Sequence, residues 1–386
     1  MTGEKSGERR RKVIYLSGTR ADFGLMKSTL LQAAQCVDLS VAATGMHLDP
    51  QFGHTVDEIR AAGLYVCGEV PVDVSTRTPA SMSAAIGEGL KGITTLLQHE
   101  RPDILLLLGD RGEMLAGALA ALHLGIVCVH LHGGERSGTV DEPVRHAISK
   151  LSTYHLVATS ESRERLVRMG EADSRVFVTG APGLDGLREL ADGVPGTAVV
   201  PGTDWLLSPG RPFALVLFHP VVQQASDAYT QTTHVLKALH QTGLPVVWLE
   251  PNADAGSLDI LRALGDVPMP PGSVRVKHLP RHLFCAAMKH CAVMVGNSSS
   301  GIIEAATFGT PVVNVGDRQR LRERNTNVQD VAPDQQLVHD AIQNALNHGK
   351  WPCDNRYGDG QSGERIASHL ASLSLDRSVL EKTNAY

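Results

Sequence analysis

Short apolar runs alternate with longer amphipathic segments along almost the whole chain, and this alternation constrains the fold more than any other feature. Runs that are apolar throughout are typical of strands buried on both faces of a parallel sheet, with helices as the connections. In the first half of the chain such runs occur at 13–16, 39–43, 104–108, 126–131, 155–158 and 176–178. In the second half they return at 213–218, 246–249, 274–276, 293–295 and 312–315. The pattern therefore predicts two parallel-sheet α/β domains in tandem.

Breaks in this alternation predict where the domains begin and end. Glycines and prolines gather in residues 191–211, which indicates a linker. On either side we expect Rossmann-like domains at 13–190 and 212–360. The charged residues 1–12 predict a flexible basic tail, and residues 361–386 predict a terminal helix that crosses back to the first domain. Because ligands bind beside the carboxyl ends of parallel strands, we expect the site in a cleft between the domains.

The composition excludes several classes of protein. The 386 residues are 42% hydrophobic and 20% charged, with 36 Lys and Arg against 41 Asp and Glu and a formal net charge of -5. The apolar fraction excludes general disorder, and an acidic chain argues against nucleic acid as the main partner. No apolar run approaches the roughly 20 residues of a membrane helix. Six cysteines without a C-x-x-C pair indicate reduced thiols and a cytoplasmic protein.

The first two strand-end loops offer an arginine and an acidic turn. Residues 17–24 follow the first strand, and Arg20 in this loop could bind a phosphate. The loop is not G-x-G-x-x-G, so a nicotinamide or flavin cofactor is poorly supported, and an ordinary helix cap is the alternative. In the second loop, Asp110, Arg111 and Glu113 stand where a helix begins. We expect a function for Asp110, whereas capping explains Glu113 equally well.

The third loop, residues 130–146, is the densest in titratable side chains. It contains three carboxylates, three histidines and two arginines, among them Glu135, Asp141 and Arg145. Such a cluster predicts acid–base chemistry, because donor and acceptor must be held together with separated pKa values. One alternative is a helix capped by Thr139 with Glu142 at capping-box spacing. Another is a metal site built on the pair His130-x-His132 with Glu135 or Asp141.

The fourth loop, residues 296–304, joins a strand to a helix through small polar residues. Its backbone N–H groups, with the hydroxyls of Ser298, Ser299 and Ser300, predict a cradle for a diphosphate. Glu304 could accept hydrogen bonds from two adjacent sugar hydroxyls. A purely structural cap is the alternative. Three more strand ends carry candidates: His219, Arg318 and the weaker Asn252. The alternatives are a surface or packed histidine for His219, a solvated loop charge for Arg318 and an ordinary turn for Asn252.

Several of these motifs together resemble a known family. They are Gly18-Thr19-Arg20-Ala21-Asp22-Phe23-Gly24, Gly109-Asp110-Arg111, Gly133-Gly134-Glu135, the stretch 137–152 and Gly296-Asn297-Ser298-Ser299-Ser300-Gly301. The chain resembles the hydrolysing UDP-N-acetylglucosamine 2-epimerases of sialic and related nonulosonic acid biosynthesis. The resemblance implies a GT-B-like fold and a reaction without metal or redox cofactor. UDP would leave by anti elimination to a 2-acetamidoglucal, and water would add to give the free 2-epimeric sugar, N-acetylmannosamine. Non-hydrolysing relatives carry Pro-Glu where this chain has Ala21-Asp22.

The resemblance also implies roles for individual residues. The catalytic set would be Asp110, Glu135, Asp141 and His219. The substrate-binding set would be Arg20, Arg111, Arg145, Asn252, Ser298, Ser299, Ser300, Glu304 and Arg318. Which carboxylate takes the C2 proton, and which delivers water, stays open at this point. The expected partners are a UDP-sugar, UDP and further copies of the chain, as a homodimer or homotetramer, with neither nucleic acid nor membrane.

Three other functions compete with this one. The first is the same reaction on a UDP-2,4-diacetamido-2,4,6-trideoxyhexose of the legionaminic acid pathway, since motifs that bind UDP and attack C2 say little about C4 and C6. The second is a glycosyltransferase of the same architecture, which the clustered carboxylates disfavour. The third is a non-catalytic nucleotide-sugar sensor.

Overall fold

The N-terminal half of the chain builds one parallel sheet. In the computed structural model, which describes residues 9–76, 78–138, 140–208 and 210–386, a seven-stranded sheet has the order β3-β2-β1-β4-β5-β6-β7. All its described pairings are parallel. The strands are β1 (Lys12–Ser17), β2 (Asp38–Thr44), β3 (Val66–Val70), β4 (Ile104–Leu108), β5 (Val127–Leu131), β6 (Tyr154–Val157) and β7 (Val176–Val178).

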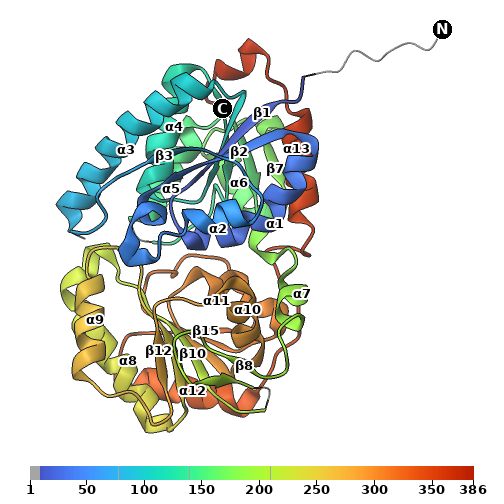
Figure 1. Ribbon diagram of the computed structural model, residues 1–386. Coiled ribbons are helices and arrows are strands. Elements are labelled where there is room, and N and C mark those ends of the chain that lie inside the picture. The colour runs from blue at the N-terminus through green and yellow to red at the C-terminus, as the bar shows by residue number, and fades with distance from the viewer. Residues whose placement is uncertain (1–8, 77, 139, 209) are drawn as a thin grey trace.

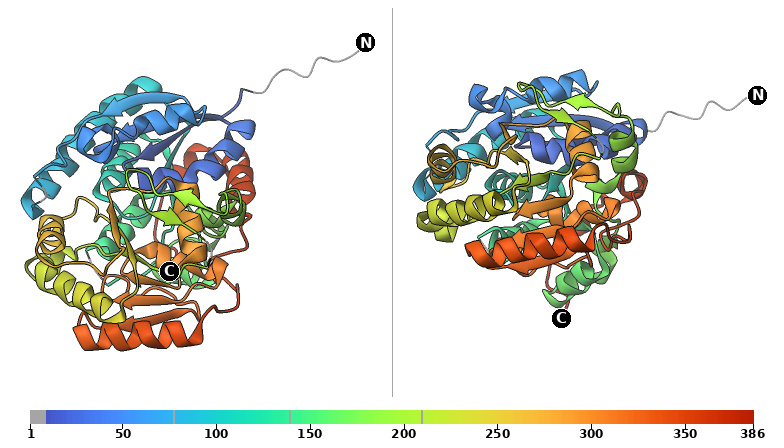
Figure 2. Two further views of the ribbon diagram at one scale, coloured as in Figure 1. Left: turned by 60° about the horizontal axis from the view of Figure 1, so that its bottom comes forward. Right: turned by 90° about the horizontal axis from the view of Figure 1, so that it is seen from below.

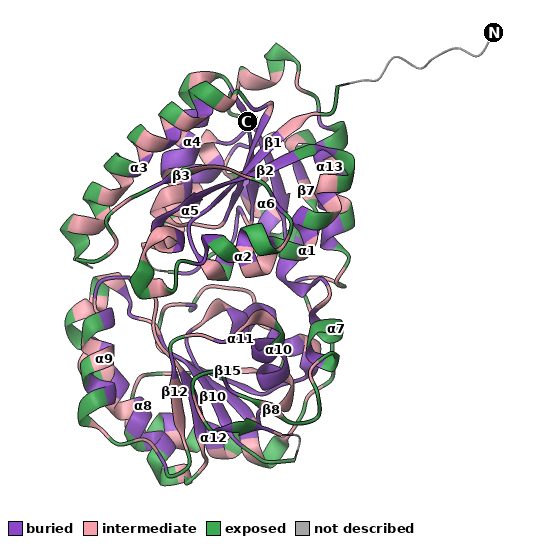
Figure 3. Cartoon of the chain, in the orientation of Figure 1, coloured by how far each residue is buried: buried purple, intermediate pink, exposed green. Residues whose placement is uncertain are grey.

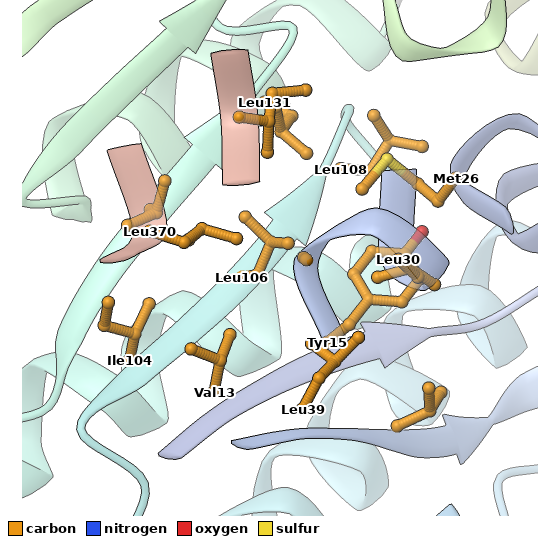
Figure 4. Packing of buried hydrophobic residues seen from close by; sticks show 14 of the residues in the cluster. Val13, Tyr15, Met26, Leu30, Leu39, Ile104, Leu106, Leu108, Leu131 and Leu370 are labelled. Carbon is orange, nitrogen blue, oxygen red and sulfur yellow. The ribbon is translucent and has the colours of Figure 1, made fainter. Parts of the chain in front are cut away.

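Helices cover both faces of this sheet. The face of Tyr15 and Leu106 packs against α1 (Arg20–Cys36) and α13 (Ser362–Ser372), and Figure 4 shows this cluster from close by. The opposite face packs against α3 (Pro79–Glu100), α4 (Gly112–Leu124) and α5 (Asp141–Leu151). The remaining helices of this half are α2 (Val56–Ala61) and α6 (Ser160–Arg168). Every residue of β4 is buried, as the unbroken run of apolar residues predicts.

The C-terminal half builds a second parallel sheet. It has six strands in the order β12-β11-β10-β13-β14-β15, all paired in parallel in the described residues. They are β10 (Ala214–Leu217), β11 (Val246–Leu249), β12 (Val274–Val276), β13 (Val293–Gly296), β14 (Val312–Val315) and β15 (Val328–Val331). One face carries α8 (Ala228–Thr242), α9 (Ser257–Asp266) and α12 (Gln335–His348), and the other carries α7 (Leu187–Asp192) and α10 (Arg281–His290). The expected two parallel-sheet α/β domains are confirmed (Figure 1).

Buried residues line both sheets, and exposed residues lie on the outer sides of the helices, as Figure 3 shows. The shorter elements lie at the ends of strands and in connections. The 3₁₀ helices are Gly45–Leu48, Pro50–Phe52, Asp173–Arg175, Pro182–Leu184, Val222–Asp227, Ala305–Phe308 and Arg377–Leu380, and a short α-helix, α11, spans Ser299–Ile303. No helix in the described part of the chain is long and apolar enough to cross a membrane.

The chain passes between the domains twice. Residues 191–211, where the sequence predicts a linker, contain the antiparallel pair β8 (Ala198–Val199) and β9 (Leu206–Leu207), and Trp205 packs in the C-terminal core. After α12, which lies on the outer side of the molecule in Figure 2, the chain returns to the N-terminal sheet as α13. The chain before the first passage contacts the chain after the second: Asp185 Oδ1 accepts from the N–H of Ser362, the first residue of α13, at 2.9 Å. The domain boundaries themselves stay a prediction.

The carboxyl ends of the two sheets face each other. Arg111, which follows β4, lies 3.7 Å from the carboxylate of Asp254, which follows β11. Arg318, which follows β14, lies 3.9 Å from Asp141 at the start of α5. Residues of the two strand-end edges are therefore in contact, as expected for paired α/β domains.

Candidate active site

The loop after β4 is held in place by a buried histidine. Nε2 of His130, on β5, lies 2.7 Å from the carbonyl oxygen of Gly109, and Nδ1 lies 3.1 Å from Ser149 Oγ. His130 is fully buried, and burial lowers its pKa to about 3. The imidazole is therefore neutral and can donate Nε2–H to the carbonyl beside Asp110. Both ring nitrogens contact the protein, which leaves the His130-x-His132 metal site without its first ligand.

Arg145 contacts two of the predicted catalytic residues. Its side chain is fully buried on α5 and donates one nitrogen to Asp110 Oδ2 and another to the carbonyl oxygen of Glu135, at 2.9 Å. Burial opposes ionisation of Asp110, but Arg145 and Arg322 outweigh it and lower its pKa. Asp110 is thus a fixed carboxylate anion. Arg145, predicted to bind substrate, contacts the Asp110 carboxylate and the Glu135 backbone in this conformation.

Glu135 lies between a histidine and an arginine from the other domain. Its Oε1 accepts from His132 Nδ1, and its Oε2 pairs with Nη1 of Arg322. Burial disfavours the anion, yet Arg322 and His132 hold the pKa of Glu135 well below its usual range. The turn before it requires glycine: Gly134 has φ 76°, and a Cβ there would lie 2.3 Å from the Ser162 carbonyl oxygen.

Asp141, the first residue of α5, is the least constrained of the three acids. In the described ranges its one ion pair is the 3.9 Å contact with Arg318, and no hydrogen bond to its carboxylate occurs there. Burial, and then the negative charge of Asp110, raise its pKa. Two carboxylates with lowered pKa values therefore stand beside one whose pKa is raised, which is the separation that acid–base chemistry requires.

His219 is a neutral hydrogen-bond donor. Its Nδ1 accepts from the Asn252 backbone N–H at 3.2 Å, and Asn297 brackets its main chain with bonds of 2.7 and 2.8 Å. Burial, with the charges of Arg318 and Arg111, lowers the pKa of His219 to about 3. Because Nδ1 accepts, the proton of the neutral ring lies on Nε2. Asn252 thus contacts His219 through its backbone.

Arg318 connects the acids to the serine loop. It donates to the carbonyl oxygen of Asn297 at 3.2 Å, while its other nitrogen faces Asp141. Ser298 is the N-cap of α11, and its Oγ lies 2.9 Å from Ser300 Oγ. Ser299 begins the helix. The structure therefore brings the catalytic candidates and the predicted diphosphate loop together through a single arginine.

Two substrate-binding candidates are occupied by protein partners. Arg20 forms a two-pronged ion pair with Glu58, with Nε 2.8 Å from Oε2. Glu304 is buried and pairs with Arg281 at 2.7 Å, and burial raises the pKa of Glu304. Arg281 also donates to the Gly183 carbonyl oxygen at 2.9 Å. Both candidates lie between the two domains' strand-end loops, but a ligand would have to compete with these pairs.

The capping alternatives have mixed outcomes. The first loop does form a capping box, in which Thr19 and Asp22 bond each other's backbone N–H. Glu113 makes no such cap at α4, where it pairs with Arg111 at 3.4 Å. Thr139 lies outside the described residues. Glu142 accepts the N–H groups of residues 137 and 138 at 2.7 and 2.6 Å.

Sequence reasoning missed Arg322 and Arg281, and it considered His132 only as a metal ligand. After the strand end at 315, every second residue from 318 to 324 is an arginine. This pattern indicates that the segment faces an anionic group. Nothing in the sequence shows that the anions are the protein's own carboxylates. In the described residues, no three His, Cys, Asp or Glu side chains are placed to hold a metal ion.

The sequence is similar to those of one known family. The profile of the UDP-N-acetylglucosamine 2-epimerase family matches residues 29–371. A Legionella pneumophila protein named UDP-N,N'-diacetylbacillosamine 2-epimerase (hydrolyzing) is 47% identical over 97% of this chain and 100% of its own length. A Neisseria meningitidis UDP-N-acetylglucosamine 2-epimerase is 33% identical over 92% of this chain and 94% of its own.

A solved structure gives the fold. The UDP-N-acetylglucosamine 2-epimerase of Methanocaldococcus jannaschii, in complex with UDP-GlcNAc and UDP, superimposes with a TM-score of 0.74. The match covers 93% of this chain and 99% of that one. Because the identity is 17%, the match shows the fold alone. The expected GT-B-like architecture is confirmed. On the family profile and the near full-length relatives, the chain belongs to the UDP-N-acetylglucosamine 2-epimerase family, as one of its hydrolysing UDP-sugar 2-epimerases.

Proposed function

We propose that this enzyme hydrolyses and epimerises a UDP-2,4-diacetamido-2,4,6-trideoxyhexose of the diacetylbacillosamine type. The observation that carries the proposal is the 47% identity, over the whole length of the relative, to a protein named for that substrate. This reverses the order of the two substrates expected from sequence, where UDP-N-acetylglucosamine came first. UDP-N-acetylglucosamine is the second candidate, since a 33% identical relative carries that name.

In the proposed reaction the C2–H and C1–O bonds break and a C1=C2 double bond forms. UDP leaves with the electron pair of the C1–O bond, and the C2 proton passes to a protein base. Water then adds its oxygen to C1, and a proton returns to C2 from the opposite face. The sum is UDP-sugar plus water giving UDP plus the free 2-epimeric sugar.

We assign the exchangeable proton to Asp141. Asp110 and Glu135 are held by arginines at hydrogen-bonding distance, which stabilises their anions and makes them weak bases. Asp141 has only the 3.9 Å contact with Arg318 among the described residues. Its raised pKa brings it nearer the operating pH, where a general base is most effective.

We assign the departing diphosphate to the C-terminal domain. The serine loop, Arg318 and Nε2–H of His219 are donors that stand next to one another. A neutral histidine donor keeps its proton over the physiological pH range, and prearranged donors stabilise charge that develops on the leaving group. The ribose role of Glu304 and the phosphate roles of Arg20 and Arg111 remain proposals of the same kind.

The same family resemblance supports three further proposals. The enzyme would work in the cytoplasm, which fits six cysteines that are all described and all free. It would assemble as a homodimer or homotetramer. Its product would feed the synthesis of a nonulosonic acid.

Parallel assays of the two nucleotide sugars test the proposal. The enzyme is incubated in D2O with each UDP-sugar in turn, and NMR follows UDP, the free sugar and deuterium at C2. We expect UDP release without an added acceptor, one deuterium at C2, and a kcat/KM at least about tenfold higher for the diacetamido sugar. Faster turnover of UDP-N-acetylglucosamine would reverse the substrate assignment. A requirement for an acceptor would indicate a glycosyltransferase instead.

A further inference from the structure

Arg322 crosses from the C-terminal domain into the acidic centre of the N-terminal domain. It lies in the loop after β14, and its Nη1 pairs with Glu135 Oε2. Its Nη2 lies 3.9 Å from Asp110 Oδ2. The side chain is only 9% exposed. One guanidinium group therefore faces two of the three candidate catalytic acids, although it belongs to the other half of the molecule.

The backbone around Arg322 is fixed on both sides. Arg324 donates to the carbonyl oxygens of Arg322 and Gln319 at 2.7 and 2.6 Å. On the other side, Tyr357 donates its hydroxyl to the Glu323 carbonyl oxygen at 2.9 Å. Glu323 also crosses the domain boundary, since its carboxylate accepts from a threonine hydroxyl of the N-terminal domain at 2.7 Å. The loop holds Arg322 in one place when the domains are docked.

Glu135 depends on this cation. Its side chain is 3% exposed, and a carboxylate so deeply buried tends to take up a proton unless cations compensate. The charged and titratable groups that face it are Arg322 and Tyr357 from the C-terminal domain, His132 from its own loop and Arg145 from α5, with Glu323 as a further negative charge. Arg145 is already engaged by Asp110 and by the Glu135 carbonyl oxygen.

We propose that Arg322 is a positioning residue that keeps Glu135 and Asp110 ionised and aligned only while the two domains are docked. Docking of the C-terminal domain then completes the acidic centre as well as the nucleotide site. The inference deepens the proposed 2-epimerase function and rests on it. Domain docking would thus control whether the catalytic acids are charged.

The test compares Arg322→Met, Arg322→Lys and the control Arg320→Met. Arg320 lies in the same loop, and its substitution by Met removes the same charge as Arg322→Met. Its side chain is 63% exposed and lies 3.9 Å from Asp317. For each variant, UDP release is measured from pH 5 to 9, with UDP affinity by calorimetry and the melting temperature as checks of folding. We expect kcat of Arg322→Met to fall about 100-fold to 1000-fold, with UDP affinity within about threefold of the wild type.

The pH profile separates this role from a merely structural one. In the wild type Glu135 stays ionised over this pH range, because Arg322 and His132 hold its pKa well below its usual range, and the acid limb of kcat belongs to Asp141. Without Arg322 the buried Glu135 loses its main compensating charge and its pKa rises. We expect Glu135 then to determine the acid limb of kcat, which moves to higher pH by about 1 unit or more. Arg322→Lys keeps a cation and should show a smaller shift, while Arg320→Met should match the wild type.

A rescue experiment covers the case in which the long side chain is needed for packing. Arg322→Ala is assayed with millimolar guanidinium, which should restore part of kcat, whereas equal sodium chloride should not. An unchanged kcat and acid limb in Arg322→Met, or loss of activity that guanidinium does not restore with the acid limb unmoved, overturns the inference. A wild type that is inactive on both UDP-sugars refutes the proposed function itself, so the two failures are distinct.

Discussion

At the scale of single residues, the surroundings of three carboxylates give them different pKa values. Asp110, Glu135 and Asp141 carry the same functional group within one cluster. Arginines at hydrogen-bonding distance keep the first two ionised, whereas Asp141 meets a cation only at 3.9 Å. His130 and His219 are neutral because they are buried, and each is oriented by bonds to the backbone. Charge at this site therefore depends on burial together with the distance to neighbouring charges, arginines above all.

The role of Asp141 predicts a specific mutant phenotype. In Asp141→Asn we expect kcat to fall by about 100-fold to 10000-fold, because the group that exchanges the C2 proton is lost. UDP affinity should stay within a few-fold. In the wild type, activity should fall as the pH drops through the raised pKa of Asp141, since its base form disappears, and this limb should be missing from the residual activity of the variant.

Measurement of kcat against pH for both proteins, with UDP affinity alongside, checks this prediction. Asp173→Asn serves as the control, because its carboxylate is 61% exposed and pairs only with Arg163 among the described residues. A variant Asp141→Asn with wild-type turnover would contradict the assignment.

At the scale of elements, the strands and the loops that follow them could be predicted, but the contacts across the domains could not. Unbroken apolar runs such as β4 have one stable environment, between two layers of helices, so the sequence predicts them well. The segment 191–211 shows the limit: its glycines and prolines indicate a linker, yet Trp205 packs in a core. Local composition indicates which backbone conformation a segment prefers, but it does not indicate which part of the protein the segment packs against.

The candidate site follows the same rule. Residues in strand-end loops, such as Asp110 and His219, could be found because topology places such loops at one edge. Arg322 could not be found, because its partner Glu135 lies 187 residues away and only the docking of two domains brings them together. The pairing of Glu304 with Arg281 lies within the C-terminal domain, and it escaped prediction because only the packing of α10 brings the two side chains together.

The turn at the end of β13 predicts a strict need for glycine. Gly296 has φ 137°, and a Cβ there would lie 1.9 Å from the Leu217 carbonyl oxygen of β10. We expect Gly296→Ala to lower the free energy of unfolding by more than about 1 kcal/mol, since both the dihedral angle and the close approach exclude a side chain.

Urea unfolding of Gly296→Ala and of a matched glycine variant measures the effect. Gly265→Ala is the control, because this glycine lies in α9 with open space around its Cβ position. It should raise the free energy of unfolding by about 0.5 to 1 kcal/mol. Equal effects of the two substitutions would contradict the argument.

At the scale of the whole molecule, the last residues of the chain complete the first domain. Lys382 lies 2.6 Å from the buried carboxylate of Glu171 and donates to the carbonyl oxygens of Ser149 and Ser152 at the end of α5. The backbone N–H of Ala385 donates to the Gly170 carbonyl oxygen at 2.9 Å. The C-terminal end therefore supports the helix whose other end carries Asp141.

Removing this cation should destabilise the protein. Lys382→Met leaves Glu171 with Lys150 and His155 as its remaining partners, and we expect the free energy of unfolding to fall by about 2 to 4 kcal/mol. Thermal and denaturant unfolding measure the change. Lys91→Met, at an exposed position of α3, should change it by less than about 0.5 kcal/mol. A similarly small effect of Lys382→Met would show that the C-terminal residues do not stabilise α5.

The return of the chain as α13 also determines the order in which the protein can be finished during synthesis. Domains commonly fold as they leave the ribosome, the first one before the second. Here the first sheet lacks one of its covering helices until residues 362–372 have emerged, so the face that α1 and α13 share stays partly uncovered while the second domain is made. A ribosome that stops before residue 362 would release a chain in which the apolar residues that α13 covers stay exposed. Such products would be recognised by chaperones through the half that was translated first.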